Sequence, residues 1–143
     1  MIDSVRLVRL YGLVVGIGLL LEGGALLLGE ALRIAPGDTR HNALHVVWGT
    51  IILVLLLTRR DPRTTILVVG TFGVFYTALA VVGVLVDRPF GLLLGPGENA
   101  FHFIVGPLAL LLSVRAAAQL SSSSDSSAAY VSSTSGPRSR VDS

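Results

Sequence analysis

Apolar positions along this chain fall into four long blocks, separated by short segments that hold charge, Pro and Gly. The blocks predict membrane-spanning helices over about residues 8–29, 42–58, 64–86 and 98–118, because about 20 apolar residues at about 1.5 Å rise per residue cross the hydrocarbon core. Charge and a proline end the second block, in the run from Arg59 to Arg63. The pattern predicts an all-α membrane protein.

The composition changes after the fourth block. Residues 121–143 contain eleven Ser, together with Gly136 and Pro137, and such a segment buries too little apolar surface to offset its ordering entropy. We therefore expect a transmembrane domain over residues 1–120 and a disordered Ser-rich tail over 121–143, which serves to solubilise or, through Tyr130 and Val131, to dock a partner.

Overall composition excludes several classes of protein. The 143 residues are 52% hydrophobic and 14% charged, against about 25% charged in an ordinary soluble domain. The absence of Cys excludes a disulfide framework and a Cys-ligated zinc or iron–sulfur site. All eleven basic residues are Arg and the net charge is only +2, so the basic excess indicates membrane topology and no nucleic-acid partner.

The Arg residues are distributed unequally between the two ends of the predicted helices. Eight lie at the end that carries both termini, and three lie at the other end, namely Arg33, Arg40 and Arg88. Because basic residues accumulate in cytoplasmic loops, both termini are expected in the cytoplasm, with the loops of each hairpin outside. A cleaved signal peptide would have a shorter apolar core than the first block and a small-x-small cleavage site, which is not evident.

An internal repeat relates the second and fourth blocks. Asn42-Ala-Leu-His45-Val-Val-Trp-Gly49 aligns with Asn99-Ala-Phe-His102-Phe-Ile-Val-Gly106 at an offset of 57 residues. The same offset pairs Gly16 with Gly73 and His41 with Glu98. The unit is therefore a helical hairpin used twice, and the four transmembrane helices are predicted to form two parallel-repeat hairpins related by a pseudo-two-fold axis along the membrane normal.

These motifs resemble those of small four-helix bacterial membrane proteins grouped as domain of unknown function 4383. The resemblance covers residues 5–117 and rests on the His41, Asn42, His45 and Gly49 run, on the aromatic third block, and on the Glu98, Asn99, His102 and Gly106 run. Glu98 stands where the family pattern has Asp, and the first block lacks the family's Gly-Phe pair. The resemblance implies a bacterial cytoplasmic membrane protein and no particular activity, ligand or partner.

Polar residues open the second and fourth blocks. His41 and His45 share a helix face, as do Glu98 and His102, and convergence of the two pairs would offer ligands to Zn²⁺ or another divalent transition metal. Alternatives are haem b bound by His45 and His102, a proton or small-solute pathway, and polar contacts that only fasten the hairpins together. The sequence favours this last interpretation, which predicts a structural or accessory membrane protein that is not an enzyme, with no catalytic residue and no cofactor.

Glu22 is the second polar feature inside a predicted span. It lies roughly 9 Å inside the first helix by the helical rise, where a carboxylate needs a partner or a proton. His45, His102 and Arg33 are its candidate partners, and the alternative is a neutral Glu bonded to a neighbouring helix. We place Glu22, Asn42 and Asn99 in one intramembrane polar network, and we expect the lipid bilayer as a partner, with a membrane protein or a second copy as a further possibility.

Overall fold

The computed structural model describes residues 3–34, 37–86 and 88–134, with side chains described up to residue 123. It contains the helices α1 (Ser4–Ala31), α2 (Thr39–Thr58), α3 (Pro62–Leu85) and α4 (Pro96–Thr134), with a short 3-10 turn η1 (Pro89–Gly91) before α4. Four of these helices are long and apolar enough to cross a membrane. The all-α prediction is confirmed over the described ranges, and the molecule is a multi-pass membrane protein by the length and composition of its helices.

Aspartates fix where three of the helices begin. The side chains of Asp3, Asp38 and Asp61 accept hydrogen bonds from the backbone N–H groups of Val5, Arg40 and Thr64, respectively. These bonds satisfy backbone donors that have no partner within a helix. Pro62 follows Asp61 at the first helical position, where a missing N–H costs nothing.

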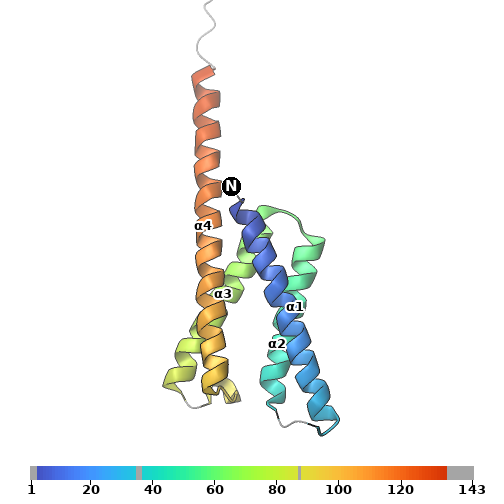
Figure 1. The fold of residues 1–143 in the computed structure, drawn as a ribbon. Helices are drawn as coiled ribbons and strands as arrows, with labels where there is room; N and C mark the ends of the chain where they lie inside the picture. The colour runs from blue at the N-terminus through green and yellow to red at the C-terminus, as the bar shows by residue number, and fades with distance from the viewer. Residues whose placement is uncertain (1–2, 35–36, 87, 135–143) are drawn as a thin grey trace, which may run out of the picture.

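The helices form two hairpins, in which α1 packs on α2 and α3 packs on α4. Figure 1 shows the hairpins side by side, with the N-terminus and the α2–α3 connection at one end of the bundle. We call this the terminal end. The opposite end carries the end of α1, the starts of α2 and α4 and the turn η1, and we call it the loop end.

In both hairpins the two helices approach each other closely at equivalent positions of the repeat. A Cβ added at Gly49 would lie 2.8 Å from the carbonyl oxygen of Gly16, and one added at Gly106 would lie 2.5 Å from the backbone nitrogen of Thr77. Nine buried positions also recur at the offset of 57, namely 8/65, 12/69, 16/73, 19/76, 23/80, 45/102, 49/106, 52/109 and 56/113. The predicted parallel repeat is therefore present in the packing.

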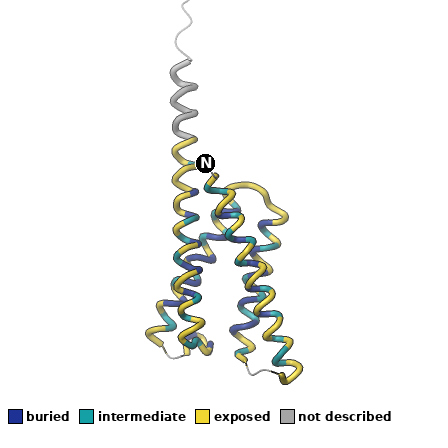
Figure 2. The backbone as a smooth tube through the Cα atoms, viewed as in Figure 1, coloured by how far each residue is buried: buried dark blue, intermediate teal, exposed yellow. Residues whose placement is uncertain are grey.

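Buried residues lie where the helices face one another, and exposed residues lie on the outside of the bundle (Figure 2). Many of the exposed residues are large and apolar. At the terminal end the guanidinium of Arg9 donates hydrogen bonds to the carbonyl oxygens of Leu56 and Arg59. These carbonyls belong to the last turn of α2, which has no partners of its own for them. This contact closes the α1–α2 hairpin at that end.

The last helix is longer than expected. α4 continues past Leu120, where we predicted a disordered tail, and ends at Thr134. Ser hydroxyls in this stretch bond back to carbonyls three or four residues earlier, as Ser121 does to Ala117 and Ala118, so that Ser is accommodated in the helix. Residues 135–143 of the predicted tail lie outside the described residues, and disorder of the tail in solution stays a prediction.

Candidate functional site

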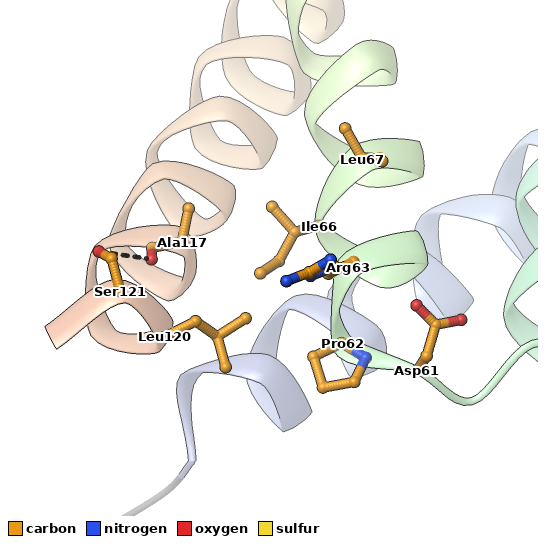
Figure 3. A pocket seen from close by; sticks show the side chains of 8 residues that line it. All are labelled: Asp61, Pro62, Arg63, Ile66, Leu67, Ala117, Leu120 and Ser121. Atoms are coloured by element: carbon orange, nitrogen blue, oxygen red, sulfur yellow. Dashed lines mark hydrogen bonds between the residues drawn. The ribbon is translucent and has the colours of Figure 1, made fainter. Parts of the chain in front are cut away.

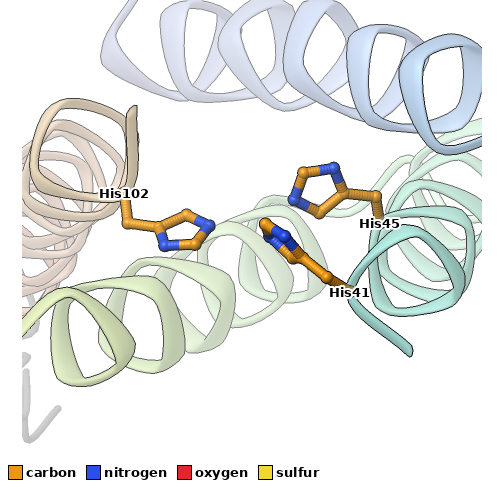
Figure 4. Close-up of side chains that lie close together, drawn as sticks. All are labelled: His41, His45 and His102. Carbon is orange, nitrogen blue, oxygen red and sulfur yellow. The ribbon is translucent and has the colours of Figure 1, made fainter. Parts of the chain in front are cut away.

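The three histidines of the chain meet between the two hairpins near the loop end. His41 and His45 extend from α2, and His102 extends toward them from α4 (Figure 4). One ring nitrogen from each can be chosen so that all three lie within 4.8 Å of one another. The ring centroids are 4.5 Å apart for His41 and His45, and 5.4 Å apart for His41 and His102. The structure thus brings the histidines of the two repeats together.

These imidazoles are buried and lack hydrogen-bond partners. His41 is 5% exposed, His45 3% and His102 0%. Nε2 of His41 and both ring nitrogens of His45 and His102 have no hydrogen-bond partner among the described residues. An unsatisfied buried polar group costs about 1–3 kcal/mol, and native structures keep few of them. The described residues therefore supply no hydrogen-bond partner for five ring nitrogens in one cluster.

Two carboxylates border the cluster. Oε2 of Glu22 on α1 lies 3.4 Å from Nδ1 of His45, within ion-pair distance but not aligned as a hydrogen bond. Glu98 at the start of α4 does not join the group of histidine nitrogens within 4.8 Å. It does line the same cavity of about 230 Å³, whose walls are formed by Glu22, His41, His45, Gly97, Glu98, Phe101 and His102. Glu22 and Glu98 are both exposed residues.

The two motif asparagines lie beside the cluster but bond within their own hairpins. Nδ2 of Asn42 donates to Oε1 of Glu30 near the end of α1. Nδ2 of Asn99 donates to the carbonyl oxygen of Gly83 on α3, over 3.2 Å. Neither bond involves Glu22, so each Asn fastens a helix start to the preceding helix of its repeat.

Tyr76 is a site residue that sequence reasoning missed. Its ring is fully buried and lies 5.0 Å from the ring of His102, between centroids. Its hydroxyl has no hydrogen-bond partner among the described residues. The repeat contained a signal for it, since the offset of 57 pairs Tyr76 with Leu19, and a hydroxyl at a position that is apolar in the other copy indicates a local polar requirement.

A larger groove, of about 740 Å³, lies at the terminal end between α3 and α4 (Figure 3). Apolar side chains form most of its wall, and Arg63 and Asp61 also line it. Asp61 is engaged in capping α3. No histidine lines this groove, so it is separate from the polar cluster.

The arrangement brings together three imidazoles from two hairpins, with a small cavity on one side that is bordered by two carboxylates. Such a set suits a divalent transition metal with one coordination position left open. In comparisons with known proteins, no protein-family model, no curated protein and no solved structure matches the chain.

Proposed function

We propose that this membrane protein binds one divalent transition metal ion, with Zn²⁺ the best fit, between its two hairpins. The observation that carries the proposal is the cluster of His41, His45 and His102, which are buried, unpartnered at five nitrogens and within 4.8 Å through one nitrogen each. Nitrogens bound to zinc at 2.0–2.1 Å in tetrahedral geometry lie about 3.4 Å apart. Binding thus requires the cluster to contract by roughly an ångström, which side-chain rotation can supply.

The purely structural alternative has less support than the metal site. Polar side chains that only fasten helices together are expected to bond to one another or to the backbone, as Asn42 and Asn99 do. The histidine nitrogens named above make no such bonds. A porphyrin ligated by His45 and His102 is also disfavoured, because the ring of His41 lies 4.5 Å and 5.4 Å from theirs and occupies the space beside them.

The test uses the full-length chain in detergent, purified through a tag that contains no histidine. Because the three cluster residues are the only histidines of the sequence, metal bound through imidazole must bind there. We expect one Co²⁺ per chain with the intense visible bands of a tetrahedral site, competed by Zn²⁺. His41→Leu, His45→Leu and His102→Leu should each weaken binding at least 100-fold.

Ser113→Ala is the matched control, because it removes another buried, unpartnered polar atom from α4 away from the cluster. It should leave Co²⁺ binding unchanged. A wild-type protein that binds no stoichiometric metal, or a His102→Leu variant that retains full affinity, would contradict the proposal.

We also propose that the loop end faces the outside of a bacterial cytoplasmic membrane, with both termini in the cytoplasm and lipid tails around the exposed apolar side chains. The Arg bias toward the terminal end supports this orientation, and the resemblance to the four-helix bacterial family supports the location. Cysteines introduced singly at Gly37 and Arg60 test it in intact cells with a membrane-impermeant thiol reagent. Gly37→Cys should be labelled from outside, and Arg60→Cys only after lysis; the reverse pattern would overturn the orientation.

A further inference from the structure

Two cavities that share lining residues lie at the histidine cluster and toward the loop end. The inner cavity is the one of about 230 Å³ lined by the three histidines, Glu22 and Glu98. A second cavity of about 400 Å³, which we call the vestibule, is lined by Leu26, Gly37, Asp38, His41, Asn42, Leu93 and Glu98. His41 and Glu98 line both, so they stand where the vestibule meets the inner cavity.

The walls of this route carry acidic side chains. Asp38 and Glu98 line the vestibule, and Glu22 and Glu98 line the inner cavity. Asp38 accepts hydrogen bonds from the backbone N–H groups of Arg40, His41 and Leu93, and these bonds favour its charged form. Arg40 is exposed and lines neither cavity. A cleft walled by one sign of charge concentrates ions of the opposite sign.

The opposite side of the cluster is closed by packed side chains. Tyr76 lies against His102, and its ring contacts Phe72 at a centroid distance of 4.3 Å. Phe72, Leu19 and Ile52 are at most 1% exposed, and interiors packed in this way leave little room for a hydrated ion. None of the residues lining the groove at the terminal end lines the inner cavity or the vestibule.

We propose that the three-histidine site exchanges its ion only with the aqueous phase at the loop end, through the vestibule. Glu98 attracts the hydrated divalent cation, and His41 is the first imidazole that the cation meets. The site is then a one-sided receptor for a cation, and not a passage across the membrane. This inference rests on the proposed metal binding and adds the direction and the path by which the ion arrives.

Blocking the vestibule is the sharpest test, because the chain has no Cys of its own. Leu93→Cys places a single thiol in the vestibule at a position that is 49% exposed. The matched control is Leu67→Cys, at an exposed Leu of the groove at the terminal end. Each variant is reacted with a bulky maleimide, and Co²⁺ loading is followed by stopped-flow absorption before and after the reaction.

We expect the modified Leu93→Cys protein to load at least tenfold more slowly than its unmodified form, and the modified Leu67→Cys protein to load at its original rate. The unmodified variants report whether the substitutions themselves disturb the fold. Equal loading rates of the two modified proteins would overturn the route while leaving the metal site in place. A wild-type chain without Co²⁺ bands would overturn the proposed function instead, and the route with it.

The role of Glu98 is tested by Glu98→Gln, with Glu30→Gln as control. Glu30 has the same charge at the same end of the bundle but lines neither cavity, and Gln can keep its contacts with Asn42 and Thr39. Glu98→Gln should lower the Co²⁺ association rate about tenfold and weaken its dependence on salt, with the dissociation rate unchanged. An association rate in Glu98→Gln equal to that in Glu30→Gln would overturn the assignment of Glu98.

Discussion

Glu22 approaches the histidine cluster at His45. Its Oε2 lies 3.4 Å from Nδ1 of His45. We propose that on metal binding this carboxylate accepts a hydrogen bond from Nδ1–H, which leaves the lone pair of Nε2 for the ion. We propose that Glu22 orients the imidazole of His45 and does not itself bind the metal. Carboxylates that orient a metal-binding histidine in this way contribute a factor of about 10–100 to metal affinity.

We therefore expect Glu22→Gln to weaken Co²⁺ binding about 10–100-fold and to leave the melting temperature of the metal-free protein nearly unchanged, since Glu22 is 52% exposed. A Co²⁺ titration and a thermal melt of the same preparation measure both. Glu30→Gln serves again as the variant that loses the same charge outside the site. An affinity unchanged by Glu22→Gln would show that the carboxylate does not position His45.

Sequence reasoning identified these residues but could not choose among their partners. The helical rise placed Glu22 near the depth of the histidines, which left His45, His102 and Arg33 as candidates. The structure selects His45 because α1 packs on α2 within one hairpin. Arg33 follows the end of α1, in the connection at the loop end. That selection depends on helix packing, which spacing along the chain does not determine.

Close approach of α3 and α4 depends on a residue without a side chain. A Cβ at Gly106 would lie 2.5 Å from the backbone nitrogen and 2.8 Å from Oγ1 of Thr77, and 2.9 Å from the backbone carbon of Tyr76. Backbone atoms cannot yield as a flexible side chain can, so the helices must separate. Small residues at membrane helix contacts are favoured for this reason.

Gly106→Ala should therefore destabilise the protein by about 1–3 kcal/mol, the usual cost of overpacking. Gly18→Ala is the matched control on α1, because a Cβ there meets nothing within 4 Å, and Ala even favours the helix by up to about 1 kcal/mol. Unfolding in mixed micelles with increasing SDS compares the two. Equal stabilities of the two variants would contradict the close crossing.

Element boundaries show which parts of the fold the sequence determines. The expected spans of 42–58 and 64–86 agree with α2 (Thr39–Thr58) and α3 (Pro62–Leu85) within a few residues. Asp38 and Asp61 cap these two helices and fix where they begin. The start of α4 at Pro96 likewise agrees with the expected span of 98–118, and the helix continues beyond the end of that span. Hydropathy reports where the membrane ends and not where helical hydrogen bonding ends, so it carries no signal for a helix that continues to Thr134.

At the scale of the whole molecule, Asp38 joins the two hairpins at the loop end. Its Oδ1 accepts hydrogen bonds from the start of its own helix, and its Oδ2 accepts one of 2.6 Å from the backbone N–H of Leu93 in the α3–α4 connection. Partial burial of Asp38 works against its charge, but the hydrogen bonds from Leu93, His41 and Arg40 prevail and lower its pKa below the usual range.

A lowered folded-state pKa means that Asp38 stabilises the fold above its unfolded pKa of about 3.9 and that this stabilisation is lost as pH falls further, through the folded-state pKa. Asp38→Asn, which keeps a capping side chain, should cost about 1 kcal/mol at pH 7, a figure at the low end for hydrogen bonds to a charged group because the site is partly exposed. The difference in unfolding free energy from wild type should shrink below about pH 4. A difference in unfolding free energy that stays constant from pH 7 to pH 3 would contradict stabilisation by the charged Asp38 carboxylate.

The proposed metal site should act as a second and stronger connection between the hairpins, because two of its proposed ligands lie on α2 and the third on α4. An ion that binds only the folded state stabilises it by about 2.7 kcal/mol at 100 times its dissociation constant. Zn²⁺ should therefore raise the melting temperature of the wild-type protein. His102→Leu removes the α4 ligand, so Zn²⁺ should have no effect on its melting.

Without metal, His102→Leu should be at least as stable as wild type. His102 is fully buried with both ring nitrogens unpartnered, and an apolar side chain of similar size avoids the cost of burying them. In the metal-free protein His102 would then be destabilising, because only a bound ion satisfies its nitrogens. This is the pattern expected of a metal-binding residue and not of a structural one. Equal stabilisation of wild type and His102→Leu by Zn²⁺ would show that the ion binds elsewhere, and a large loss of metal-free stability in His102→Leu would return the cluster to a structural role.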